Sequence, residues 1–113
     1  MDKQKFPKYY LANKKKFKEF FDALENLGNV IKKQGPLDEK TAHLIQLAAA
    51  TTIRSEGAVH SHTRRAIEAG AKPEEIYHTV ILLTATIGFP TVAAALSWVD
   101  DVIGKKQSKS QKD

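Results

Sequence analysis

The sequence predicts an all-α fold of five or six helices, and three observations support this prediction. Apolar residues recur at steps of three and four residues, which places them on one face of a helix. Turn signals at Gln34-Gly35-Pro36, Gly70 and Gly88-Phe89-Pro90 divide the chain into segments of helical length. The alanine-rich stretch Ala48-Ala49-Ala50 favours helix strongly. A length of 113 residues corresponds to one domain.

The first two predicted helices lie on either side of Gln34-Gly35-Pro36. The first has an apolar face, and lysines and glutamates occupy its other side. The residues of this face are Phe17, Phe20, Phe21, Leu24, Leu27 and Ile31. The second helix runs through residues 42–50, with Asp38 as its expected N-cap and Thr41 as a weaker candidate.

Three more helices are expected in the second half of the chain. Gly57 marks a break or a tight helix start, and a third helix over residues 59–69 ends at Gly70. A fourth helix, residues 72–87, opens with Pro73, which suits a first turn. Its β-branched residues would also fit a strand, but the capped start and the length favour helix. The fifth helix extends over residues 92–103.

The fourth and fifth helices are apolar on more than one side, because Ile81, Leu82 and Ala85 do not fit a single face. A second apolar side in so small a domain predicts association with copies of the same chain. The alternative is a monomeric core with ordinary exposed apolar surface.

The composition excludes several classes of protein. The chain has no cysteine, so it has no disulfide, no thiol nucleophile and no zinc–thiolate site. No signal peptide and no membrane span are expected, which favours a cytoplasmic location. The formal charge of +5 is concentrated in lysine clusters. We expect residues 1–104 to form one domain and residues 105–113 to be a basic, disordered tail rather than a nucleic-acid binding segment.

Five short segments, in this order and spacing, resemble the carboxymuconolactone decarboxylase family, whose superfamily includes the alkylhydroperoxidase D-like proteins. The segments are residues 37–41, residues 44–48, His62 with residues 66–70, residues 73–76 and residues 88–90. The resemblance covers residues 37–103. It implies an all-helical fold of the alkylhydroperoxidase D-like type and a homo-oligomer, a trimer or a hexamer.

The peroxidase branch of this family carries Cys-x-x-Cys-x-x-x-His, with a glutamate twelve residues before the first cysteine. Aligned on His62, the cysteine positions fall on Ser55 and Ala58, and the glutamate position falls on His43. Thiol peroxidases need one thiolate to attack the peroxide and a second thiol to resolve the sulfenic acid. The resemblance alone would suggest a peroxidase, but these residues exclude the thiol route.

The decarboxylase branch also lacks the cysteines and is similar in having an acid at Glu56, a histidine at His62 and an arginine at Arg64. This likeness implies a decarboxylase or lyase that works without thiols on a small carboxylate or lactone. We expect His62 to move a proton, with Glu56 and His43 as further catalytic residues. Arg64 and Arg65 are the expected substrate-binding cations. The alternative is a non-catalytic ligand-binding or scaffold oligomer.

No metal or cofactor is expected, and a metal ion at the histidines is the alternative. His43 and His62 would approach each other if His43 has replaced the relay glutamate, and Glu56 would then be the best third ligand. His60 is a poor candidate, because it lies two positions before His62, and residues two positions apart on a helix point about 200° apart around its axis. His78 is expected to be a core or interface residue.

Overall fold

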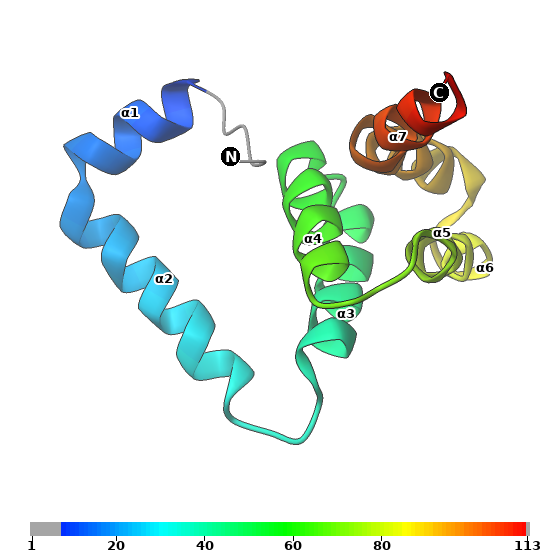
Figure 1. Cartoon of the computed structure of the whole chain (residues 1–113). Coiled ribbons are helices and arrows are strands. Elements are labelled where there is room, and N and C mark those ends of the chain that lie inside the picture. The colour runs from blue at the N-terminus through cyan, green and yellow to red at the C-terminus, as the bar shows by residue number, and fades with distance from the viewer. Residues whose placement is uncertain (1–7, 113) are drawn as a thin grey trace. The chain divides into compact units, whose positions relative to one another are not determined.

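The computed structural model describes the backbone of residues 8–112 and the side chains of residues 10–104 (Figure 1). Across residues 8–112 it contains helices and no strand, so the predicted all-α fold is confirmed. The helices are α1 (Lys8–Lys16), α2 (Lys18–Lys32), α3 (Glu39–Thr52), α4 (Glu56–Glu68), α5 (Pro73–Ile81), α6 (Thr84–Ile87) and α7 (Phe89–Lys112). They form two compact units, an N-terminal unit of residues 1–36 and a C-terminal unit of residues 37–113.

The N-terminal unit contains α1 and α2, which Phe17 separates. Tyr10 and Phe21 meet edge to face across the two helices, with ring centroids 5.6 Å apart. Nζ of Lys14 also lies 2.8 Å from Oε2 of Glu25. Helix α2 matches the predicted amphipathic helix, but it has no buried residue.

The C-terminal unit holds the hydrophobic core. Helices α3 and α4 pack together, and α7 and α5 pack against them. The buried apolar residues come from α3, α4, α5, α7 and the loop after α4. They are Leu47, Ala50, Val59, Ala66, Ala71, Ile76, Val80, Val92, Ala95, Val99 and Ile103. This burial is the main stabilising contribution to the fold.

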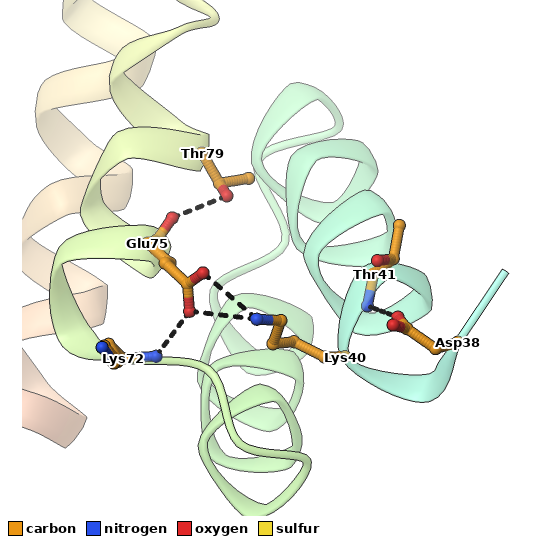
Figure 2. Close-up of polar contacts among 6 residues, drawn as sticks. All are labelled: Asp38, Lys40, Thr41, Lys72, Glu75 and Thr79. Carbon is orange, nitrogen blue, oxygen red and sulfur yellow. Dashed lines mark hydrogen bonds and ion pairs between the residues drawn. The ribbon is translucent and has the colours of Figure 1, made fainter.

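Side chains cap two of these helices in the way the sequence indicates (Figure 2). Asp38 is the N-cap of α3, and its Oδ1 accepts a hydrogen bond of 2.8 Å from the backbone N–H of Thr41. Oε1 of Glu75 accepts one of 2.8 Å from the backbone N–H of Lys72 at the start of α5. Glu75 also pairs with Lys40 at 3.2 Å and so links α5 to α3.

Two helices end in the same hydrogen-bonded motif. After α4, Gly70 has φ +101° while Ala71 donates to the carbonyl of Ala66, which is the Schellman arrangement. After α3, Ser55 donates to the carbonyl of Ala50 in the same way, but the left-handed position is occupied by Arg54. The side chain of Arg54 reaches α7, where its Nη1 donates to Oγ1 of Thr91 at 2.9 Å.

Three details differ from the sequence-based expectations. The third helix begins earlier than residue 59, because α4 starts at Glu56; of the two alternatives for Gly57, the helix start therefore holds and the break does not. The predicted fourth helix is divided into α5 and α6, because Leu83 donates to the carbonyl three residues back and Thr84 donates its hydroxyl to Ile81. His78 is exposed rather than part of the core of the single chain, so only its interface role stays a prediction.

Two further expectations concern a membrane-spanning helix and the C-terminal tail. Among the described residues, no helix is both long enough and apolar enough to cross a membrane. Helix α7 continues to Lys112, but the side chains of residues 105–113 lie outside the described part. The predicted disorder of this tail therefore stays a prediction.

Candidate functional site

Two histidines meet where α3 packs against α4. Nδ1 of His43, on α3, lies 3.3 Å from Nδ1 of His62, on α4. The ring centroids are 5.5 Å apart and the ring planes are inclined by 38°. His43 is almost fully buried, with 1% of its surface exposed, whereas His62 is half-buried. One ring is therefore shielded from solvent and the other is partly open to it.

The short distance between the two nitrogens restricts the protonation of the pair. A hydrogen bond between two ring nitrogens needs one that carries a proton and one that does not. If both rings were cationic, two N–H groups and two positive charges would face each other in a partly buried place, which is unfavourable. A hydrogen bond between the two Nδ1 atoms therefore requires a proton on one of them and none on the other.

Buried polar groups without a partner lie on the same two helices. Oε1 of Gln46, one turn after His43, is buried and accepts no hydrogen bond among the described residues. The hydroxyl oxygen of Thr63, next to His62 in the sequence, is in the same state. Oγ1 of Thr51, further along α3, is a third such group. Buried groups of this kind are rare in folded proteins.

The two positions that align with the cysteines of the peroxidase branch lie at the start of α4. Ser55 is the N-cap, and its Oγ accepts a hydrogen bond of 3.3 Å from the backbone N–H of Ala58. Ala58 is half-buried and packs against the core. The serine hydroxyl thus stabilises a helix end.

Glu56 lies beside His60. Its Oε2 is 4.0 Å from Nε2 of His60, which in turn is 2.9 Å from Oδ2 of Asp101 on α7. His60 and His62 are two residues apart on α4, so they point to different sides of the helix. The sequence-predicted group is thus distributed over two sites, with His43 and His62 in one and Glu56 in the other.

The two predicted substrate-binding arginines differ in environment. Arg64 is half-buried, and burial lowers its pKa, helped by the neighbouring charge of Arg65 and opposed by Glu68. Arg65 is exposed. It follows His62 by three residues, so the two lie on adjacent positions of one helix face.

Sequence reasoning missed Gln46 and Asp101. Gln46 carries a signal, because it lies three residues after His43 on the same helix and is polar among apolar neighbours. Asp101 carries none, because it is 41 residues from His60 and only the packing of α7 on α4 brings the two together.

Comparison with known proteins gives consistent results. Residues 18–101 match the sequence model of the carboxymuconolactone decarboxylase family. An uncharacterised protein of Methanocaldococcus jannaschii is 33% identical over 91 residues, which cover 80% of this chain and 85% of that protein.

Solved structures share the fold. A carboxymuconolactone decarboxylase family protein of Legionella pneumophila aligns with a TM-score of 0.69 at 26% identity, covering 83% of this chain and 88% of that one. A protein of Thermotoga maritima aligns with a TM-score of 0.65 at 21% identity, covering 90% of this chain and 99% of that one. The second likeness concerns the fold alone.

Proposed function

The chain belongs to the carboxymuconolactone decarboxylase family, and we propose that it is a small enzyme that works without thiols. In this proposal His62 acts as general acid or base on a small carboxylate or lactone, and His43 exchanges a proton with it. The single observation that carries the proposal is the distance of 3.3 Å between the two Nδ1 atoms.

The different burial of the two rings supports distinct roles. A half-buried His62 is accessible to a small substrate, while a buried His43 can reach the substrate only through His62. When His62 gives a proton to the substrate from its other ring nitrogen, it can take one at Nδ1 from His43. His43 then takes up a replacement proton at Nε2, which lies 3.9 Å from Oε2 of the exposed Glu39. Such a relay returns His62 to the protonation state that it needs for the next reaction.

Binding of the substrate carboxylate is assigned to Arg65, with Arg64 as the second cation. Arg65 shares a helix face with His62, and its exposed guanidinium can form two parallel hydrogen bonds to a carboxylate. Glu56 was expected to act with His62, but its position beside His60 favours a role away from the proton transfer.

A non-catalytic ligand-binding or scaffold oligomer is the second candidate. One observation favours it, namely that His43 is buried and hydrogen-bonded to another helix, as a purely structural histidine would be. In this case the pair serves to fix α3 against α4, and neither ring touches a substrate.

Self-association is part of both candidates. The apolar face of α2, which is not buried within its own unit, supports a homo-oligomer, a trimer or a hexamer. The predicted second apolar side at Ile81 and Leu82, which are 51% and 64% exposed, supports it as well. We place the protein in the cytoplasm on the basis of its cysteine-free composition.

Turnover of a panel of small lactones and carboxylic acids, followed as carbon dioxide release and ring opening, tests the enzyme. We expect His62→Gln to lower the rate by about 100-fold or more, and His43→Gln to lower it less and to alter the pH profile. His78→Gln is the matched control, since His78 is an exposed histidine on α5, and it should keep the full rate. Full activity in His62→Gln would refute the acid–base role, and absence of turnover in the unmodified protein would favour the scaffold.

Peroxide provides an independent test of the thiol-free chemistry. The unmodified protein should show no thiol-dependent hydroperoxidase turnover, because its only sulfur is that of Met1. Ser55→Cys combined with Ala58→Cys restores the family's pair and should permit low activity. Robust turnover in the unmodified protein would contradict the proposal.

A further inference from the structure

Three metal-ligating side chains converge on the surface of the C-terminal unit, apart from the His43–His62 pair. They are Glu56 and His60 of α4 and Asp101 of α7, and one ligand atom from each lies within 4.8 Å of the other two. Glu56 and His60 are four residues apart and so share a helix face. Asp101 comes from a different helix, so this arrangement is a product of the tertiary fold.

The charges of this cluster favour a cation. Both carboxylates face the same atom, Nε2 of His60, at 2.9 Å for Asp101 and 4.0 Å for Glu56. With a neutral imidazole, the three side chains carry a charge of about −2, and the two carboxylates repel each other. A proton on His60 compensates half of this charge, whereas a divalent cation compensates all of it.

The spacing also fits a metal. Zinc binds nitrogen and oxygen ligands at about 2.1 Å, so two ligand atoms in a tetrahedral site lie about 3.4 Å apart. The observed separations of 2.9 Å and 4.0 Å lie on either side of that value. Since Glu56 and Asp101 are exposed, small side-chain rotations suffice to equalise them.

Arg64 lies on this face of α4, one turn after His60. Glu68, one turn further, raises its pKa and so interacts favourably with it. The positive charge of Arg64 is thus partly compensated by a carboxylate outside the cluster.

We propose that Glu56, His60 and Asp101 bind a divalent first-row transition-metal ion such as Zn²⁺. One imidazole and two carboxylates suit this class of ion better than Mg²⁺ or Ca²⁺, which prefer oxygen ligands throughout. Three protein ligands leave the fourth position to water. The bound ion ties α4 to α7 and adds to the stability of the C-terminal unit, independently of the proposed acid–base function.

Calorimetric titration of the full chain with zinc chloride, after treatment with EDTA, tests this site. We expect one zinc ion per chain, and a rise in the Tm of about 5 °C when free zinc is ten times its dissociation constant. Magnesium chloride should produce neither effect. Absence of zinc binding would overturn the proposal.

Four variants locate the ion. His60→Ala should abolish binding, and the conservative changes Glu56→Gln and Asp101→Asn, at exposed positions that tolerate substitution, should weaken it at least about tenfold. His78→Ala is the matched control for non-specific binding to a surface histidine and should bind as the unmodified protein does. Binding that survives in Glu56→Gln and Asp101→Asn at full strength would overturn the proposal.

A fifth variant separates this site from the proton-relay pair. His62→Gln should retain zinc binding and the gain in Tm. If His62→Gln instead loses the ion, the metal belongs to His43 and His62, and the proposed cluster is wrong.

Discussion

The two units of this chain differ in how far they bury their apolar residues, although the C-terminal unit also leaves some exposed, such as Ile53 and Leu82. In the C-terminal unit, the apolar positions of α3, α4, α5 and α7 form a closed core in which Leu47, Val59 and Ile76 have no exposed surface. In the N-terminal unit, α2 has an equally regular apolar stripe, but none of its residues is buried and Phe20 exposes 60% of its surface. The same helical pattern thus leads to a core within its own unit in only one of the two units.

This contrast indicates that the C-terminal unit carries the stability of the fold and that the N-terminal unit serves association. Burying a leucine or phenylalanine side chain stabilises a protein by about 1.5–3 kcal/mol, so a stripe left in water forgoes a large contribution. Exposed apolar stripes of this size are typical of interaction surfaces. We therefore expect the C-terminal unit to fold on its own core and α2 to become stable on association with another copy of the chain.

The largest effect is expected from charges on the stripe of α2. Leu24→Glu combined with Leu27→Glu should convert the oligomer to a monomer of 12.6 kDa, because buried unpaired carboxylates are very unfavourable. Light scattering after size-exclusion chromatography measures the mass. Asn26→Glu with Asn29→Glu adds the same charge to polar positions of the helix and should leave the mass unchanged. A monomeric unmodified protein would remove the basis of the comparison.

The next effect is the loss of core packing. In the monomeric Leu24→Glu and Leu27→Glu background, Leu47→Ala should lower the free energy of unfolding by about 2–5 kcal/mol, because it leaves a cavity in a closed core. Ile31→Ala on α2, in the same background, should change it by less than about 0.5 kcal/mol. Urea denaturation measures both. Equal losses at the two positions would show that α2 belongs to the core of the single chain.

Smaller effects are expected when two glycines are replaced by alanine, and the two changes should have opposite signs. Gly70→Ala should destabilise the C-terminal unit by about 1 kcal/mol, since φ of +101° is unfavourable for a residue with a Cβ atom. Gly28→Ala, within α2, meets no atom within 4 Å and should favour the helix by about 0.5–1 kcal/mol. Thermal unfolding and circular dichroism at 222 nm report the two changes. A stabilising Gly70→Ala would contradict the assigned helix end.

The smallest effect concerns alkaline pH and is confined to the C-terminal unit. Tyr77 on α5 donates its hydroxyl to Asp100 on α7, and burial together with this carboxylate raises the pKa of Tyr77 to about 12. In the unfolded chain the pKa of a tyrosine is about 10. The stabilisation that the Tyr77 hydroxyl gives to the folded state is therefore complete below about pH 10 and is lost as the pH rises through about 12. Between these values the Tm of the unmodified protein should fall more steeply than that of Tyr77→Phe. Parallel curves would show that the tyrosine proton does not stabilise the fold.

Much of the secondary structure was determined by the sequence itself. Asp38, Gly70 and the Gly88-Phe89-Pro90 signal define helix ends where the structure has them, because capping hydrogen bonds and left-handed glycines depend on neighbouring residues only. The amphipathic stripe of α2 was likewise predictable, as were the absence of a thiol site and, from the family resemblance, a possible approach of His43 to His62.

Only the tertiary structure decided the rest. Nothing in the sequence signalled a left-handed Arg54, which is held by a hydrogen bond to Thr91 from α7. The sequence also gave no signal that His60 contacts Asp101, or that Glu56 lies beside His60 and apart from His62. The periodicity of a helix determines which side of it is apolar, but it carries no information about which distant segment covers that side. The same limit explains why apolar stripes of the C-terminal unit form a core while the stripe of α2 is not buried within its own unit, since burial is a property of packed elements.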